Sequence, residues 1–205
     1  QADSLLCLTV ASEFSSSFDS AVVAAREAED TLPCNRLMVL DTKSASGGQG
    51  LIALEAWRRA SNGDGLEDVV TAVQKVMSSV RLTAFLDTLF YLWKGGRVPG
   101  IMHVGTSLLK IKPLFELKGG RVRRVARPRT YSKAMEMLME SMREQVGTSE
   151  VHAMVVHADA ANAADELRRR VEDEFYCSEL SVSEFTPVMG AQTGPGLLGV
   201  AYWSL

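Results

Sequence analysis

The sequence predicts a mixed α/β fold in two parts, a parallel α/β domain over residues 1–82 and an α+β domain over residues 83–205. In the first part, strand-like and helix-like segments alternate with short links, which is typical of parallel strands joined by helices. In the second part, Lys118-Gly119-Gly120 separates two strand-like runs and indicates a hairpin in a mainly antiparallel sheet flanked by helices. The chain has 205 residues, 46% of them hydrophobic, which is enough for a sizeable core.

Two apolar runs of strand length and three helical segments make up the first part. The run at 36–40 reads Arg-Leu-Met-Val-Leu, a continuous apolar pattern that predicts a buried strand. Ser15-Ser16-Ser17 can cap the first helix, and Pro33 ends it. The predicted order is a strand at 5–10, a helix at 18–30, a strand at 36–40, a Gly-rich turn at 44–50, and helices at 51–60 and 66–80.

The second part predicts strands and helices in a less regular order. Ala134, Leu138, Met142 and Val146 share one helical stripe, which predicts a long helix that starts at Thr130 or Ser132. The predicted order is a strand at 83–86, a short helix at 87–93, strands at 108–117 and 121–125, a helix from about 130 to 146, a strand at 151–158, a helix at 159–176, and two apolar strands on either side of the loop Gly194-Pro195-Gly196.

Bulk properties exclude several classes of protein. The net charge of −3 and the pI near 5.7 argue against a nucleic-acid partner. The sequence has no run of 18 apolar residues and no signal-peptide pattern at its start. Cys7, Cys34 and Cys177 are an odd, scattered set and predict reduced thiols in a cytoplasmic protein.

A cluster of serines lies between the first predicted strand and the first predicted helix. Ser12, Ser15, Ser16 and Ser17 would lie near free backbone N–H groups and the positive end of the helix dipole. Hydroxyls at such a place suit a small anion such as a carboxylate or a phosphate. Ordinary N-capping explains the same residues, and both interpretations stay open here.

The segments 87–98 and 118–133 carry most of the other candidate contacts. In the first, a short helix is followed by Lys94-Gly95-Gly96-Arg97, and Arg97 is suited to face an acidic group. A cation that only complements the helix dipole is the alternative. The second segment holds seven positive charges with a single aromatic residue, Tyr131, which makes a poor platform for stacking nucleic-acid bases. A solvated hairpin face, or a docking surface for an acidic partner, explains it better.

The three histidines form no obvious catalytic or metal site. His152 and His157 are five residues apart in a predicted strand and therefore point to opposite faces. His103 stands alone in a predicted loop. The sequence contains no nucleophile-elbow pattern and no phosphate-loop lysine motif.

Four segments, taken together, resemble the DegV family of bacterial fatty-acid-binding proteins. Ser12-Glu13-Phe14-Ser15-Ser16-Ser17-Phe18-Asp19-Ser20-Ala21 is similar to the family's Ser-x-Leu-Ser-Gly-Thr-Tyr-x-Ser-Ala element. The other three segments are 39–50, which resembles the family's Asp-Ser/Thr turn, 89–98 with 109–113, which resembles its Leu-x-Lys-Gly-Gly-Arg and Ile-Lys-Pro elements, and 190–196, Gly-Ala-Gln-Thr-Gly-Pro-Gly.

This resemblance implies a carrier with no catalytic residue, metal or cofactor, which binds a long-chain fatty acid in an apolar tunnel. The family presents the carboxylate to a separate ATP-dependent fatty acid kinase subunit, and transient contact with a membrane is expected. By position, the resemblance assigns the head group to Ser12, Ser15, Ser16, Ser17, Gln192, Thr193 and Gly194. It assigns the cavity mouth or the kinase contact to Lys94 and Arg97.

The chain departs from the family pattern at three places. Gln192 stands where the family usually has histidine, and glutamine can donate a hydrogen bond but cannot carry a proton or a charge. Ser16 and Ser17 replace the usual Gly and Thr. The family's opening strand and a Thr/Ser loop have no counterpart, so the chain is expected to be a fragment. Its N-terminal sheet is then incomplete, cleaved or completed by another chain, and these alternatives stay open here.

Two other functions stay open beside the carrier. A serine-dependent acyl or phosphoryl transferase would use one of Ser15–Ser17 as its nucleophile, but it needs a nearby base that the sequence does not reveal. A structural subunit that completes the sheet of another protein is the third hypothesis.

Overall fold

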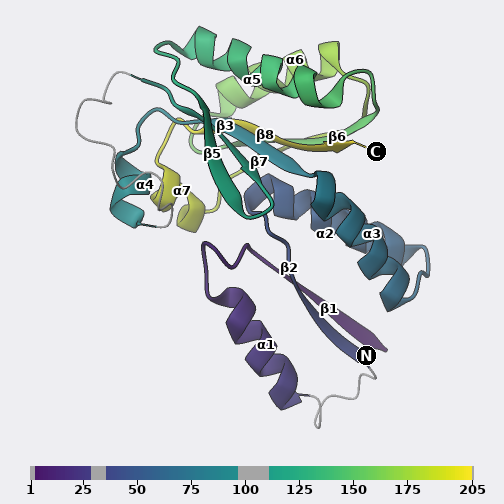
Figure 1. Ribbon diagram of the computed structural model, residues 1–205. Helices are drawn as coiled ribbons and strands as arrows, with labels where there is room; N and C mark the ends of the chain where they lie inside the picture. The colour runs from purple at the N-terminus through teal and green to yellow at the C-terminus, as the bar shows by residue number, and fades with distance from the viewer. Residues whose placement is uncertain (1–2, 29–35, 97–110, 205) are drawn as a thin grey trace.

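The computed structural model describes residues 3–28, 36–96 and 111–204 (Figure 1). Within these residues the strands form a two-stranded sheet, β1-β2, and a six-stranded sheet in the order β5-β4-β3-β8-β6-β7. The strands are β1 (Ser4–Thr9), β2 (Arg36–Asp41), β3 (Arg81–Phe85), β4 (Leu114–Lys118), β5 (Arg121–Ala126), β6 (Val151–His157), β7 (Cys177–Glu184) and β8 (Leu198–Ser204).

Seven helices within the described residues surround these sheets. In Figure 1, α5 and α6 cover one face of the six-stranded sheet, while α2, α3, α4 and α7 lie on the other side. The helices are α1 (Ser17–Ala28), α2 (Ser46–Ser61), α3 (Leu66–Ser79), α4 (Phe90–Gly95), α5 (Tyr131–Val146), α6 (Ala161–Glu174) and α7 (Pro187–Thr193).

Strand directions confirm the predicted fold class. β1 and β2 are parallel, with Ser4 opposite Arg36 and Thr9 opposite Asp41. In the larger sheet, only β6 and β7 are parallel among the described strand pairs, and the other four pairs are antiparallel. The hairpin predicted around residues 118–120 joins β4 to β5. The division of the chain at residue 82 stays a prediction.

The main core lies between the six-stranded sheet and the pair α5 and α6. Met135, Leu138 and Met142 of α5 are fully buried against Phe85 and Leu198 of the sheet. This is the face that the predicted helical stripe presents. The helix begins where Thr130 Oγ1 accepts a hydrogen bond from the Lys133 backbone N–H at 3.2 Å, as the N-cap prediction expected.

A second core forms where α2 and α3 pack on the opposite face of the sheet. Leu51, Ile52 and Val73 are buried there with Trp203 of β8, and side chains of β1 and β2 pack against the same cluster. Helix α2 begins at Ser46, five residues earlier than predicted. The close approach of Gly47 to the sheet explains this, since tertiary packing outweighs the poor helix propensity of the three glycines in the first two turns of α2.

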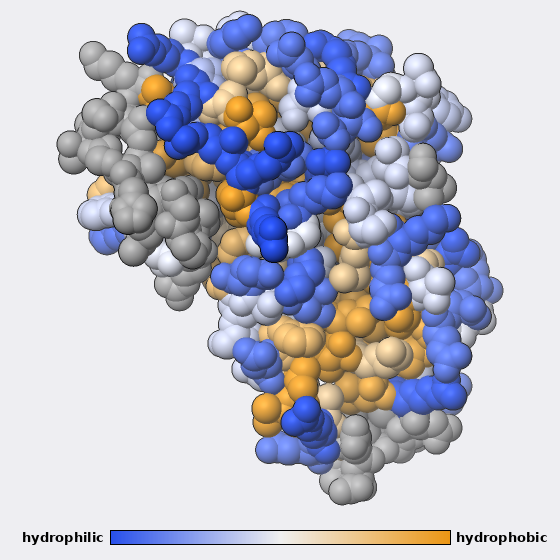
Figure 2. All heavy atoms as spheres, viewed as in Figure 1, coloured by the Kyte–Doolittle hydropathy of each residue, from blue (hydrophilic) through white to orange (hydrophobic). Residues whose placement is uncertain are grey.

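The two N-terminal strands are less buried than the sequence predicted. Among the residues of β1 and β2, only Thr9 is buried, and Leu5 is 45% exposed. Figure 2 shows hydrophobic side chains gathered over this pair, whereas hydrophilic side chains cover the region of β5. A parallel strand is usually covered on both faces and paired at its edges, and here the pair forms only a two-stranded sheet in the described residues.

The sequence prediction was wrong about the segment before the Gly-Pro-Gly loop. Residues 187–193 form helix α7 and not a strand, because Pro187 occupies the first helical turn and Thr186 Oγ1 accepts a hydrogen bond from the Met189 N–H at 3.5 Å. The strand that precedes α7 is β7, at Cys177–Glu184. The strand predicted at 108–117 begins at Leu114, and its first three residues lie outside the described residues.

Candidate functional site

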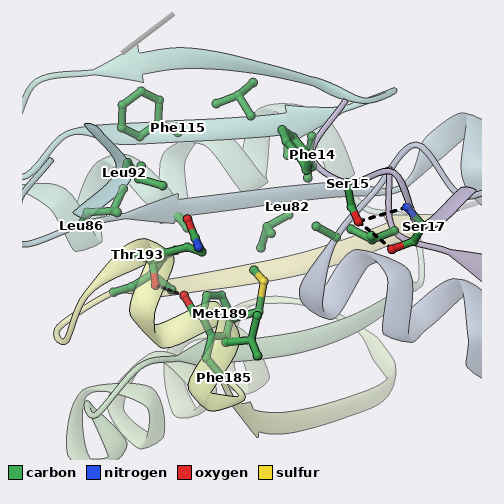
Figure 3. A pocket seen from close by; sticks show the side chains of 18 residues that line it. Phe14, Ser15, Ser17, Leu82, Leu86, Leu92, Phe115, Phe185, Met189 and Thr193 are labelled. Atoms are coloured by element: carbon green, nitrogen blue, oxygen red, sulfur yellow. Dashed lines mark hydrogen bonds between the residues drawn. The ribbon is translucent and has the colours of Figure 1, made fainter. Parts of the chain in front are cut away.

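A cavity of about 470 Å³ lies between the six-stranded sheet, the loop before α1 and helix α7 (Figure 3). Val188 lines it and yet is 73% exposed, so the cavity opens to solvent beside α7. The lining residues are Val10, Phe14, Ser15, Ser17, Ala45, Leu82, Ala84, Leu86, Leu92, Phe115, Leu117, Val122, Phe185, Val188, Met189, Gln192, Thr193 and Leu197.

Strand alternation explains the apolar wall. Leu82 and Ala84 of β3, with Phe115 and Leu117 of β4, point into the cavity. The residues between them point to the opposite face, where Phe85 joins the main core. The hairpin and β3 thus supply one continuous apolar surface.

Two of the four candidate serines line the cavity. Ser15 Oγ lies 2.6 Å from Ser17 Oγ and accepts a hydrogen bond from the Ser17 backbone N–H at 3.2 Å. Ser15 therefore satisfies the N–H group of the first residue of α1, from the position before the N-cap residue Ser16, and also faces the cavity. Ser16 is exposed and Ser12 is held by Asp41 and Lys43, and neither lines the cavity.

The other candidate residues at the C-terminal end lie on α7. Gln192 and Thr193 line the cavity, and Thr193 Oγ1 donates a hydrogen bond to the Met189 carbonyl at 3.0 Å. Gln192 Oε1 is buried without a hydrogen-bond partner within the described part of the chain. Gly194 ends the helix at φ 80°, and a Cβ there would overlap the ring of Tyr91.

Figure 3 shows the serines and the α7 residues at different ends of the cavity. Ser15 and Ser17 lie near Phe14, Thr193 lies toward Leu86, and Leu82 and Met189 lie between them. The cavity therefore has an apolar middle with hydroxyl groups toward both ends. Such a lining suits a molecule with a long apolar part and a polar head.

The two candidate cations lie away from the cavity lining or outside the described residues. Lys94 is exposed on α4, with its ammonium 5.7 Å from the centre of the Phe90 ring. Arg97 lies outside the described residues.

Most of the apolar lining was missed by sequence reasoning. Phe14, Leu82, Ala84 and Phe115 shape the cavity, but none of them was a candidate. An alternating pattern on β3 and β4 was available as a signal. The pattern marks Leu82, Ala84, Phe115 and Leu117 as one apolar face, but an apolar strand face packs against a protein core as readily as it lines a ligand cavity.

The lining offers little for catalysis. Its four polar residues, among the 18 described, are two serines, a glutamine and a threonine, with no acid, histidine, lysine or arginine. A serine nucleophile needs a base within hydrogen-bond reach, and none of these residues supplies one. The described residues also contain no group of three or more side chains that could hold a metal ion.

Comparisons with known proteins identify the family. A family model described as "Uncharacterised protein, DegV family" matches residues 1–205. A DegV domain-containing protein of Streptomyces coelicolor is 38% identical over 200 residues, which cover 97% of this chain and 69% of that protein. The chain belongs to the DegV family, as the sequence motifs predicted.

Solved structures of DegV proteins have the same fold. One from Thermus thermophilus, described by its fatty acid binding, matches with a TM-score of 0.90 and 31% identity, covering 100% of this chain and 72% of that one. One from Thermotoga maritima, described as revealing a fatty acid binding function, matches with a TM-score of 0.85 and 28% identity over 99% and 70% of the two chains. In the described residues, no helix is long and apolar enough to cross a membrane.

Proposed function

We propose that this chain binds a long-chain fatty acid in the cavity beside α7, as a carrier without catalytic activity of its own. The observation that carries the proposal is the cavity of about 470 Å³ with 14 apolar residues among its 18, in a chain similar to a fatty-acid-binding protein from Thermus thermophilus. Each buried methylene contributes about 0.8 kcal/mol, so a tail of about a dozen carbons contributes roughly 10 kcal/mol before the costs of binding.

The carboxylate is proposed to lie at the Ser15–Ser17 end. Hydroxyl groups and the first N–H groups of α1 favour a negative charge there, and α1 is a helix of 12 residues. Gln192 and Thr193 are the competing head-group contacts, since an amide can also donate a hydrogen bond to a carboxylate. Ser12, Ser16 and Gly194, which the resemblance also assigned to the head group, are proposed to act through the loops that hold these residues.

The acid is proposed to be presented to a fatty acid kinase subunit in the cytoplasm. Arg97 and Lys94 are the proposed kinase contacts, because the resemblance assigns the segment 89–98 to the cavity mouth. Under this division of labour, Arg97→Ala weakens phosphorylation of the bound acid by the kinase while lipid retention stays close to that of the unmodified protein. Equal loss of both would contradict it.

Mass spectrometry on the purified protein tests the carrier function. The native protein is weighed first, and its lipids are then extracted and identified. A fatty acid bound at near-equal stoichiometry supports the proposal, because a largely apolar cavity should hold its ligand through purification. A protein that arrives empty and takes up no added palmitate contradicts it.

Paired serine variants test the position of the head group. Ser15→Ala and Ser17→Ala should weaken binding of palmitate more than binding of the matching alcohol, because only the acid carries a charge. Ser16→Ala is the matched control, since it removes a hydroxyl from the same loop that does not line the cavity and leaves the backbone unchanged. If Gln192→Leu weakens acid binding and the serine variants do not, the carboxylate lies at the α7 end.

A further inference from the structure

Lys43 lies at the end of β2, where it meets three oxygen atoms from two segments. Its ammonium is 2.7 Å from Asp41 Oδ2, 3.1 Å from Ser12 Oγ and 3.2 Å from Glu13 Oε1. The backbone of Lys43 is in the left-handed region, with φ 52°, which is uncommon for a residue other than glycine.

The backbone of Lys43 makes a second connection, to the β4–β5 hairpin. Its carbonyl accepts a hydrogen bond from the Gly120 N–H at 2.6 Å. Gly120 is in the left-handed region at φ 76°, and a Cβ there would come within 2.6 Å of the Glu13 carboxylate. Glycine at this position therefore lets the hairpin turn approach the loop closely.

Both connected segments line the cavity, although Lys43 itself does not. The loop carries Phe14 and Ser15 into the cavity, and Leu117 and Val122 flank the hairpin turn. One residue thus joins, through its side chain and its carbonyl, the two walls that meet at the serine end.

We propose that Lys43 is a positioning residue that holds the Phe14–Ser17 segment against the β4–β5 turn and so sets the geometry of the head-group end. The proposal rests on the proposed function for the identity of the ligand. It does not require Lys43 to touch the fatty acid.

The contacts of Lys43 with Asp41, Ser12 and Glu13 differ from an isolated surface ion pair, which contributes little because both side chains stay mobile and solvated. The Asp41 side chain is only 8% exposed, against 42% for Lys43. Asp41 also accepts hydrogen bonds from the backbone N–H groups of Ser12 and Lys43, at 3.2 and 2.9 Å to its nearer oxygens. The ammonium therefore meets a carboxylate that is already fixed in place.

Three variants separate positioning from general stability. Lys43→Met removes the charge and keeps an unbranched side chain at the left-handed position. Lys43→Arg keeps the charge. Lys118→Met removes an exposed charge from the β4–β5 hairpin and serves as the matched control. Hydrogen exchange of the backbone amides of residues 11–17 is measured without ligand, and dissociation constants are then measured for palmitate and hexadecanol.

Faster exchange over residues 11–17 in Lys43→Met, and about threefold to tenfold weaker binding of palmitate with little change for hexadecanol, would support the proposal. Lys43→Arg should restore both, and Lys118→Met should change neither. Unchanged exchange, or equal weakening for the acid and the alcohol, would overturn it. If the unmodified protein binds neither lipid while exchange still responds to Lys43→Met, the tether stands and the fatty-acid function fails.

Discussion

The imidazole of His152 lies flat on the indole of Trp203, with ring centres 4.1 Å apart and planes inclined by 2°. His152 belongs to β6 and Trp203 to the neighbouring strand β8, opposite each other in the register. Burial and the nearby guanidinium of Arg58 lower the pKa of His152 from its ordinary value of 6.5. The carboxylates of Glu55 and Glu150 raise this pKa, but by less.

The lowered pKa of His152 predicts a loss of stability in mild acid. Below pH 6.5 the unfolded chain takes up the proton first, because the folded state resists protonation. The free energy of unfolding should therefore fall as the pH drops from about 6.5 toward the folded pKa, and then level off for this group. Urea unfolding across this range measures it, with His152→Phe as the variant that keeps a ring on Trp203 but cannot titrate. If both proteins show the same pH dependence, His152 does not cause the loss.

Glu116 predicts a second, more acidic loss of stability. Its burial opposes ionisation, but hydrogen bonds from Arg123 at 2.6 Å and Arg81 at 2.9 Å outweigh it and lower the pKa of Glu116 below the ordinary 4.5. The stabilisation should be complete above about pH 4.5 and be lost as the pH falls through the folded pKa.

Replacing Glu116 by glutamine at neutral pH should reduce the free energy of unfolding by about 1–3 kcal/mol, because the charge-assisted hydrogen bonds of a buried group are weakened. Glu172→Gln is the control, since that carboxylate is 60% exposed and pairs with Arg168 on one helix. Its change should stay within about 0.5 kcal/mol. Equal effects in chemical denaturation would show that the burial of Glu116 does not matter.

Gly47 predicts a packing effect that can be measured on its own. A Cβ at this position would lie 2.8 Å from Val156 Cγ1 and 3.0 Å from Ala201 Cβ, so Gly47→Ala should push α2 away from the sheet. We expect the free energy of unfolding to fall by about 1–3 kcal/mol. Gly190→Ala is the matched helical control, because its Cβ would meet nothing within 4 Å, and it should stabilise α7 by up to about 1 kcal/mol. Thermal unfolding of both variants decides, and a neutral Gly47→Ala would contradict the close packing.

Local signals in the sequence were sufficient for much of the fold. The stripe of Ala134, Leu138 and Met142 predicted α5 and its buried face, and the Gly pair at 119–120 predicted the hairpin. The apolar residues of 187–193 predict a strand, whereas the cap formed by Thr186 and Pro187 starts a helix there. The burial of β1 and β2 depends on what packs on them, which composition alone does not reveal.

The polar part of the candidate site was easier to predict than its apolar wall. Ser15, Ser17, Gln192 and Thr193 stand out as polar residues in a family-like pattern, and all four line the cavity. Leu82 and Phe115 are ordinary strand residues, and only the pairing of β3 with β4 brings them to one face. Lys43 becomes a candidate only in the folded structure, because the hydrogen bond from the Gly120 N–H to its carbonyl joins segments that are far apart in the sequence.

Filling the cavity should separate ligand binding from folding. Ala84 lies on β3 at the cavity wall and is buried, so Ala84→Phe places a ring in space that the proposed acyl chain would occupy. Binding of palmitate should fall at least about tenfold, while thermal stability changes little because the ring enters an existing cavity and does not displace packed atoms. Ala191→Phe adds the same ring to the exposed side of α7 and should leave affinity unchanged. Isothermal titration of both variants with palmitate measures the effect. Full binding by a folded Ala84→Phe protein would mean that the acid lies somewhere other than this cavity.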